Sequence, residues 1–257
     1  MRWRSLLFVP GDRPDLADKA QRYSPDAVIL DLEDAVPADG KPAARSNVAD
    51  AVARLPEDLD IWIRVNAPGT EWFADDLASL PPGIAGIVVP KWEAPLELTL
   101  PVIAGLESAV GVADARTILQ GSVVGCYFGA EDYIADLGGV RTPTNAEVLF
   151  ARSAVVLAAR VAGIHALDMV TLDFSDEGRF RTEASEARAL GYAGKLCIHP
   201  KQVALANEAF APSPEEVDRA RRLLAAFERN GGHVFTFEGQ MVDEVIAAQA
   251  RAVLLSP

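Results

Sequence analysis

Two acidic residues stand out because each follows an apolar run that is typical of a buried strand. Glu107 comes directly after PVIAGL (from Pro101), and Asp132 comes shortly after VVGCYF (from Val123). If these runs are neighbouring parallel strands, their ends lie about 4.8 Å apart. Two carboxylates that close repel each other unless one is protonated or a cation lies between them. Mg²⁺ suits such a pair, because it binds carboxylate oxygens, keeps several waters and contacts substrate oxygens directly.

Polar residues also follow the other apolar runs of the chain. Any one of them is ordinarily a loop residue or a helix cap, and a salt-bridge network is the alternative interpretation of the acidic pair. The set as a whole is harder to explain in that way, because seven of the eight runs end in an ionisable group. The residues at these positions are Asp31, Glu33, Asp34, Arg64, Asn66, Lys91, Glu107, Glu131, Asp132, Asp173 and His199.

Four of these residues are candidates for contact with a substrate or with metal-bound water. Arg64 carries a planar guanidinium that can hold a substrate carboxylate through two hydrogen bonds. Glu33 and Asp34 are candidates for holding metal-bound waters close to a substrate. Lys91 is the second candidate for the substrate carboxylate. It is also a candidate for a Schiff-base lysine, although the carboxylate pair favours a route through a metal.

The elements that would bring these residues together are eight apolar segments separated by helical patterns. The segments are nearly continuous in Val, Ile and Leu, which is typical of strands that are buried on both faces in a parallel sheet. They begin at Ser5, Ala27, Asp60, Ile84, Pro101, Val123, Met169 and Lys195. Helices are predicted over Arg13–Tyr23, Pro42–Arg54, Asn145–Gly163 and Glu183–Leu190, and the helices after the fourth and fifth strands are expected to be short.

This alternation predicts an α/β fold, a (β/α)8 or TIM barrel, over residues 1–212. The barrel explains the polar residues, since catalytic groups in this fold lie at the carboxyl ends of the strands. A doubly wound open sheet is the alternative, but no GxGxxG turn follows the first strand.

Residues 213–257 are not needed to close a barrel. They contain an amphipathic helical pattern over Pro214–Asn230, the pair Gly231–Gly232, a short strand HVFTFEG and a last helix from Asp243 to Leu255. Apolar residues on one face of the first helix need a surface to cover. We therefore expect this segment to form a helical lid or an arm for oligomerisation.

Charge and composition limit the classes of partner. The 257 residues are 50% hydrophobic and carry a net charge of −13, which argues against binding nucleic acid or an anionic membrane. An anionic substrate remains compatible, because a few cations focused in a pocket can override the global field. No apolar run approaches membrane-spanning length, and the first residues lack a signal-peptide core, so a cytoplasmic location is expected.

Nine segments, in order along the whole chain, resemble the citrate lyase β-subunit-like family of the HpcH/HpaI aldolase/citrate lyase superfamily. They are LLFVPGDRP (from Leu6), VILDLEDAV (from Val28), KPAAR (from Lys41), IRVNAPGT (from Ile63), VPKWE (from Val89), GLESAVG (from Gly105), FGAEDYIADLGG (from Phe128), CIHPKQV (from Cys197) and FEGQMVD (from Phe237). The chain is shorter than many relatives after the fourth and fifth strands. In this it is similar to stand-alone members that lack the partner subunits of the citrate lyase complex.

The resemblance implies a barrel that binds Mg²⁺ through Glu107 and Asp132, with Arg64 on the carboxylate of a 2-keto acid. It implies a carbon–carbon lyase that acts on CoA or acyl-carrier thioesters of hydroxy acids, such as citryl, malyl or citramalyl thioesters. An aspartate that matches Asp243 is expected to come from the C-terminal lid of a neighbouring subunit and to serve as acid or base. Homotrimers, or hexamers of trimers, are the expected assemblies.

A CoA thioester also requires cations for its phosphates. Arg13, Lys19, Lys41 and Arg45 are candidates, and each is explained as well by a role in surface solubility. Other activities stay open: a malyl-CoA thioesterase or malate-synthase-like enzyme, and a class II pyruvate aldolase acting on free hydroxy-keto acids. The FEGQMVD tail speaks against the simple aldolase. A non-catalytic scaffold is disfavoured by the complete set of candidate residues.

Overall fold

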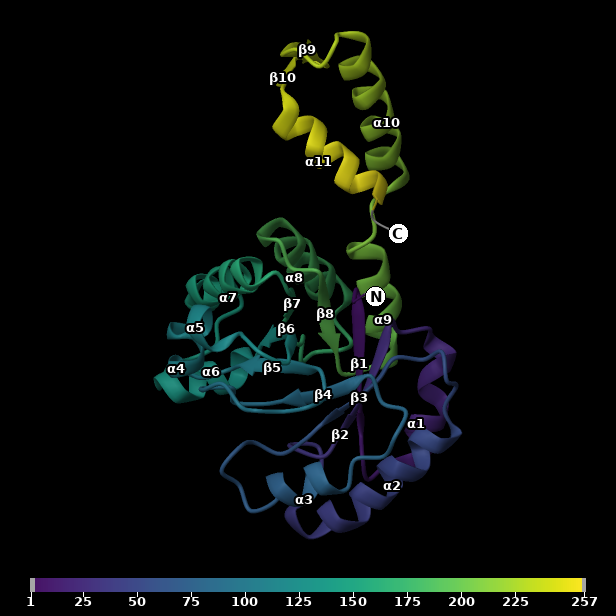
Figure 1. The fold of residues 1–257 in the computed structure, drawn as a ribbon, viewed down its shortest axis with the longest axis vertical. Helices are drawn as coiled ribbons and strands as arrows, with labels where there is room; N and C mark the ends of the chain where they lie inside the picture. The colour runs from purple at the N-terminus through teal and green to yellow at the C-terminus, as the bar shows by residue number, and fades with distance from the viewer. Residues whose placement is uncertain (1–2, 256–257) are drawn as a thin grey trace. The chain divides into compact units, whose positions relative to one another are not determined.

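The computed structural model describes residues 3–255 and divides into two compact units, residues 3–210 and residues 211–255. In the first unit, eight parallel strands close a barrel in the order of the chain, and β8 pairs with β1 (Figure 1). The strands are β1 (Ser5–Pro10), β2 (Ala27–Asp31), β3 (Ile61–Arg64), β4 (Gly86–Val89), β5 (Val102–Leu106), β6 (Val123–Phe128), β7 (His165–Asp168) and β8 (Gly194–Cys197). The predicted (β/α)8 barrel is therefore confirmed.

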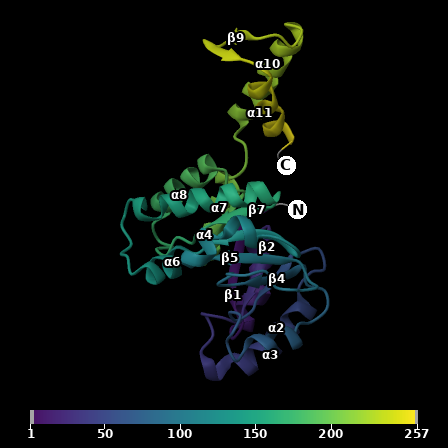
Figure 2. The same cartoon turned by 60° about the vertical axis from the view of Figure 1, so that its left-hand side comes forward.

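Helices follow the strands and lie outside the barrel, as Figure 2 shows for α2 and α3 on one side and for α4, α6, α7 and α8 on another. The α-helices of this unit are α1 (Pro14–Ala20), α2 (Lys41–Arg54), α3 (Phe73–Ala78), α4 (Ala109–Ala113), α5 (Ala115–Ile118), α6 (Ala130–Leu137), α7 (Leu149–Ala162), α8 (Glu177–Leu190) and α9 (Pro200–Ala209). Short 3-10 turns are η1 (Gln21–Tyr23), η2 (Ala38–Gly40) and η3 (Ala146–Val148). None of the helices within residues 3–255 is long and apolar enough to cross a membrane.

Local sequence explains where the longer helices stop. Gly138, Gly163 and Gly191 follow α6, α7 and α8, and each has a positive φ that ends its helix in the left-handed conformation. The loops after β4 and β5 hold only short helical pieces, α4 and α5 after β5, as the sequence predicted.

The prediction for the seventh strand was wrong. It assigned the apolar run from Met169, whereas β7 covers His165–Asp168 and the run itself forms a loop with Leu172 and Phe174 exposed. Gly163 ends α7, and the chain then enters the barrel within two residues. The strand consequently ends at Asp168, and Asp173 lies in the loop beyond it.

Aromatic side chains fill the inside of the barrel opposite glycines on neighbouring strands. Trp62 pairs in register with Gly86, and Tyr127 pairs in register with Gly105. A Cβ atom at Gly86 would lie 2.4 Å from the Trp62 ring, and one at Gly105 would lie 2.5 Å from the Tyr127 hydroxyl. The glycines thus leave the space that the large rings occupy, and this alternation of small and large residues lets the barrel interior pack closely.

The second unit is a helical hairpin closed by a small sheet. It contains α10 (Pro214–Arg229), an antiparallel pair β9 (Phe235–Phe237) and β10 (Gln240–Val242), and α11 (Glu244–Leu255). The sequence predicted one strand here, but Glu238 and Gly239 take positive φ and turn the chain into a second. In both figures α10 and α11 lie side by side, and together with β10 they bury a small core of Ala220, Leu223, Phe227, Val242, Ala247 and Ala250.

A buried ion network ties β7 and β8 to the helices around them. Asp168 is fully buried at the end of β7 and accepts hydrogen bonds from Arg152 at 3.0 and 3.1 Å. Lys195, also fully buried, donates to the same carboxylate at 2.8 Å. Asp168 is therefore the carboxylate that these two buried cations share, while Arg152 also contacts Glu186 and Lys195 also lies 3.5 Å from Glu183.

We expect Asp168→Ala to lower the free energy of unfolding by about 3–5 kcal/mol, because it leaves two buried cations without this partner. Urea denaturation followed by circular dichroism measures the loss. Glu186→Ala is the control, since Glu186 contacts Arg152 at 3.3 Å from a half-exposed position. It should cost less than about 1 kcal/mol. Equal and small losses in both variants would show that the network does not depend on Asp168.

Candidate active site

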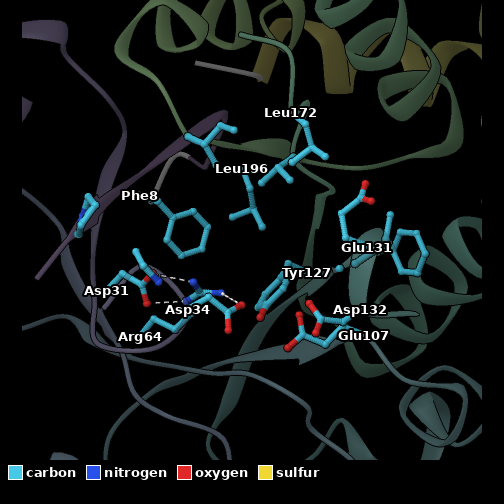
Figure 3. Close-up of a pocket in the computed structure, with 17 residues that line it drawn as sticks. Phe8, Asp31, Asp34, Arg64, Glu107, Tyr127, Glu131, Asp132, Leu172 and Leu196 are labelled. Carbon is cyan, nitrogen blue, oxygen red and sulfur yellow. Dashed lines mark hydrogen bonds and ion pairs between the residues drawn. The ribbon is translucent and has the colours of Figure 1, made fainter. Parts of the chain in front are cut away.

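A cavity of about 400 Å³ opens at the carboxyl ends of the barrel strands. Its lining combines aromatic and aliphatic side chains with a cluster of charged groups (Figure 3). The charged residues in the lining are Asp31, Asp34, Arg64, Glu107, Glu131 and Asp132. Five of these six are acidic.

Glu107 follows β5 and is 4% exposed. Its Oε1 accepts a hydrogen bond of 2.9 Å from the backbone N–H of Lys91. Its Oε2 lies against Gly129, where a Cβ atom would be only 2.4 Å away. Gly129 precedes α6, so the GAED sequence places the Glu107 carboxylate at the start of the helix that carries Asp132.

The charges around Glu107 act on its pKa in opposite directions. Burial raises the pKa of this carboxyl, and the nearby Asp132 carboxylate raises it further. The Arg64 guanidinium, the Lys91 N–H and the Tyr127 hydroxyl favour the ionised form and lower it. The net direction is upward, with burial as the largest cause and the Asp132 carboxylate adding to it.

Lys91 lies between two acidic groups of the cluster. Its Nζ is 3.5 Å from Oδ1 of Asp132 and 3.8 Å from Oε1 of Glu33. Burial alone lowers the pKa of Lys91, but the carboxylates of Glu33 and Asp132 outweigh it and raise that pKa. The backbone at Lys91 has a positive φ of 49°, which is uncommon for a residue other than glycine.

Arg64 is the best-fixed cation of the cavity. Its Nε and Nη2 donate to the two oxygens of Asp31 at 2.7 and 2.6 Å, and its Nη1 is 2.9 Å from Oε2 of Glu33. The guanidinium also lies over the Phe8 ring, 4.7 Å from its centroid. The bidentate pair with Asp31 holds the guanidinium rigidly at the wall of the cavity that Arg64 lines.

Glu33 is almost completely buried beside this arginine. Burial is the largest effect and, with the carboxylates of Glu107, Asp34 and Asp31, outweighs the attraction of Arg64 and raises the pKa of Glu33 from 4.5 to about 8. Arg64 is unable to prevent this, because its charge is already shared with Asp31.

Two residues that matter for the cavity were not given a role from the sequence. Asp31 appeared only as one of several acids at the end of a strand, but it orients Arg64. The signal for it was its spacing, since residues 31 and 33 share one face of an extended chain. Tyr127 is buried in β6 and lines the cavity. No signal in the sequence points to it, because an aromatic residue within an apolar run looks the same whether it packs in the core or lines a cavity.

Two predicted residues do not join the cluster, and a third belongs to the second unit. Lys41 is buried, and its ammonium group donates to the carbonyls of Leu32 and Glu33 at 2.8 and 3.0 Å. It therefore supports the loop after β2 from beneath and is not available to a ligand. Arg45 is likewise engaged with the buried carboxylate of Asp76 at 2.7 Å. Asp243 belongs to the second unit, where its carboxylate accepts from the N–H of Ile246 and caps α11.

Arg13 lines a second cavity of about 810 Å³ between α1 and α9. Lys19 and Lys201 line it as well, and its floor is made by apolar side chains of β1. Both cavities share Phe8, Pro10 and Ile198 in their lining, so they adjoin at these residues. A long ligand that occupies both would have its cationic contacts at one end and the carboxylate cluster at the other.

The donor set at Glu107 and Asp132 fits Mg²⁺. Both supply the carboxylate oxygens that Mg²⁺ prefers, and both line the same cavity. Within residues 3–255, no group of three or more His, Cys, Asp or Glu side chains is close enough to hold a metal ion by itself.

Comparison with known proteins gives matches over nearly the whole chain. The family model of HpcH/HpaI aldolase/citrate lyase matches residues 4–100 and 96–200. A citrate lyase subunit beta-like protein of Deinococcus radiodurans is 49% identical, over 98% of this chain and 96% of that protein. Citrate lyase subunit beta of Escherichia coli is 36% identical, over 98% and 92%. Protein CitE of Mycobacterium tuberculosis, solved with magnesium, acetoacetate and coenzyme A, is 39% identical with a TM-score of 0.89, over 98% and 97%.

The raised pKa of Glu33 predicts a dependence of stability on pH in protein that is free of divalent metal. Between about pH 4.5 and 8 the folded protein retains a proton on Glu33 that the unfolded chain releases. The contribution of Glu33 to stability is therefore complete at low pH and is lost as the pH rises through about 8. Glu33→Gln, which cannot ionise, should become more stable relative to the unmodified protein as the pH rises.

Urea denaturation at pH 5, 6.5 and 8 in EDTA measures this difference. Glu93→Gln is the control, because Glu93 is exposed and should give the same difference at each pH. Parallel pH profiles for Glu33→Gln and the unmodified protein would contradict the assignment.

Proposed function

The chain belongs to the HpcH/HpaI aldolase/citrate lyase family, and on that premise we propose that it is a Mg²⁺-dependent carbon–carbon lyase for a hydroxyacyl thioester. The substrates that we propose are citryl, malyl or citramalyl thioesters of CoA or of an acyl carrier. Cleavage gives an acyl thioester and a 2-keto acid, which is oxaloacetate, glyoxylate or pyruvate. The observation that carries the proposal is the pair Glu107 and Asp132 beside Arg64 in one cavity at the mouth of the barrel.

We propose Glu107 and Asp132 as the protein ligands of the metal. When bound there, Mg²⁺ supplies a Lewis acid for the oxygen that becomes the ketone and a contact for the adjacent carboxylate. The backbone N–H of Lys91 holds Glu107 in place at 2.9 Å. Glu33 and Asp34 lie beside Arg64 in the same cluster, and we propose that they hydrogen-bond to water at the site.

Arg64 is proposed to bind the carboxylate of the keto acid. Asp31 holds Nε and Nη2 and Glu33 lies beside Nη1, so the guanidinium has a fixed orientation at the cavity wall. Lys91 is proposed to contact the substrate as well, because its ammonium group is half exposed between Glu33 and Asp132. Both cations favour the negative charge that develops when the carbon–carbon bond breaks.

The reaction requires one base and one acid. A base removes the proton of the 3-hydroxyl group, the bond between C2 and C3 breaks, and its electron pair remains on the thioester part as an enolate. An acid then donates a proton to C2 and releases the acyl thioester. The family resemblance assigns this acid or base to the residue that matches Asp243, and we propose that role for it.

The second cavity is proposed to receive the carrier part of the thioester. Arg13 and Lys19 line it with half-exposed cationic side chains, and both pair with the half-exposed Asp15, a partner that a phosphate group can replace. Lys41, which the sequence also suggested for this purpose, is excluded by its contacts with two backbone carbonyls. The apolar contacts at Phe8 and Ile198 suit the uncharged arm that joins phosphate and thioester.

The C-terminal unit is proposed to act on a neighbouring subunit of a homotrimer or larger homo-oligomer. Its small core leaves apolar side chains exposed, including Met241 and Val245 on either side of Asp243. The capping hydrogen bond to Ile246 uses one oxygen of the Asp243 carboxylate, which leaves its other oxygen free for proton transfer.

An assay with citryl-, malyl- and citramalyl-CoA tests the reaction. We expect one of these thioesters to yield a keto acid and an acyl-CoA in equal amounts, with activity lost in EDTA and restored by Mg²⁺. Glu107→Gln and Asp132→Asn should each lose measurable Mg²⁺ binding by calorimetry while remaining folded, since removing one of two like charges relieves repulsion. Release of free CoA without a keto acid would indicate a thioesterase, and unchanged Mg²⁺ affinity in both variants would refute the metal site.

Subunit mixing tests the role of Asp243 across an interface. Arg64→Ala and Asp243→Ala should each be inactive alone, and activity should partly return after their subunits exchange. The recovered activity comes from sites that combine an intact Arg64 with an intact Asp243 of a neighbour. Glu244→Ala, at the adjacent and exposed position, is the matched control and should stay active by itself. An Asp243→Ala protein that is active alone, or a mixture that stays inactive, would rule out this arrangement.

A further inference from the structure

The hydroxyl of Tyr127 has no role in the function proposed so far, although it lies in the cavity. Tyr127 is 2% exposed and belongs to the group of side chains packed inside the barrel. Its hydroxyl oxygen is buried and makes no hydrogen bond of normal geometry. A buried hydroxyl without a partner costs free energy, so a native protein retains one chiefly where a ligand or a bound state supplies the missing contact.

The position of this hydroxyl is fixed by the strand next to it. Gly105 pairs in register with Tyr127, and a Cβ atom at Gly105 would lie 2.5 Å from the hydroxyl oxygen and 2.6 Å from the ring carbon that bears it. The phenol therefore lies flat against β5 in the space that the glycine leaves. Gly105 and Glu107 are two residues apart and face the same side of β5, so the ring leads toward the Glu107 carboxylate.

Figure 3 shows the Tyr127 hydroxyl in the gap between Arg64 and the Glu107 carboxylate. It is near enough to Glu107 to lower the pKa of that carboxyl, although it makes no hydrogen bond of normal geometry. The carboxylate accepts a hydrogen bond from the Lys91 N–H at 2.9 Å and packs against Gly129.

We propose that Tyr127 is a positioning residue for Glu107, and that its hydroxyl donates a hydrogen bond to this carboxylate once a metal ion has drawn the carboxylate into alignment. This inference rests on the proposed metal site. It assigns to Tyr127 the task of fixing the orientation of a metal ligand, a contact that usually changes metal affinity when it is removed. The competing explanation is that Tyr127 only fills the barrel, for which the ring without its hydroxyl would be sufficient.

Tyr127→Phe separates the two explanations, because it keeps the ring and removes only the hydroxyl. We expect calorimetry to show Mg²⁺ affinity reduced about tenfold. In the absence of metal, the urea midpoint of unfolding should stay the same or rise, because the variant no longer buries a hydroxyl without a partner. A combined loss of metal affinity and retention of stability is not expected from a residue that serves packing alone.

Tyr192→Phe is the matched control. Tyr192 is also buried, but its hydroxyl donates to the backbone carbonyl of Arg152 at 3.0 Å, away from the cavity. Its removal should lower the urea midpoint, because it leaves a buried carbonyl without that donor, and it should leave Mg²⁺ affinity unchanged.

The outcomes distinguish this inference from the proposed function. If the unmodified protein binds Mg²⁺ and Tyr127→Phe binds it equally well, the role of Tyr127 is refuted and the metal site stands. If both tyrosine variants lose Mg²⁺ affinity alike, the effect is a general loosening of the barrel, and the role of Tyr127 is again refuted. If the unmodified protein binds no Mg²⁺, the metal site and the inference fail together.

Discussion

Excess negative charge at the mouth of the barrel is the constraint on which the site depends. Five carboxylates gather around two cations there: Asp31, Glu33, Asp34, Glu107 and Asp132 around Arg64 and Lys91. Arg64 is largely neutralised by Asp31, so the other acids meet burial and mutual repulsion, and the pKa of Glu33 and that of Glu107 both rise. A cluster of this kind favours one more positive charge. That preference supports magnesium binding on physical grounds that are independent of any resemblance.

The acids stay close together because rigid backbone supports them. Glu107 accepts from a main-chain N–H and packs against Gly129, and the loop that carries Glu33 is held by the buried ammonium group of Lys41. Flexible side-chain partners would allow the carboxylates to move apart and relieve their repulsion. Local strain persists where many surrounding contacts hold the strained residue in place. The positive φ of Lys91 is a second example of such strain at this site.

The sequence was sufficient to predict the barrel and the residues of the charged cluster, because strand runs and the acids that follow them are local patterns. It was not sufficient for contacts that depend on how neighbouring strands align. Met169–Phe174 is as apolar as a true strand, and only the close of α7 at Gly163 shows that β7 precedes it. Lys41 carries the positive charge expected of a phosphate-binding residue. Nothing in the neighbouring sequence indicates that it is buried beneath the loop after β2. Tyr127 is uninformative until its pairing with Gly105 is known.

The pairing of glycine with an aromatic residue across adjacent strands has a consequence for how this sequence can change over time. At Trp62 with Gly86, and at Tyr127 with Gly105, the larger residue occupies space that exists only because the other lacks a side chain. Either partner replaced alone creates a clash or a void. At Gly105 only the Tyr127 ring limits the space, so a joint exchange of these two residues conserves volume, and the pair should change together over time. At Gly86 the backbone oxygen of Pro101 would also lie 2.3 Å from a Cβ atom, so this glycine should stay fixed whatever residue replaces Trp62.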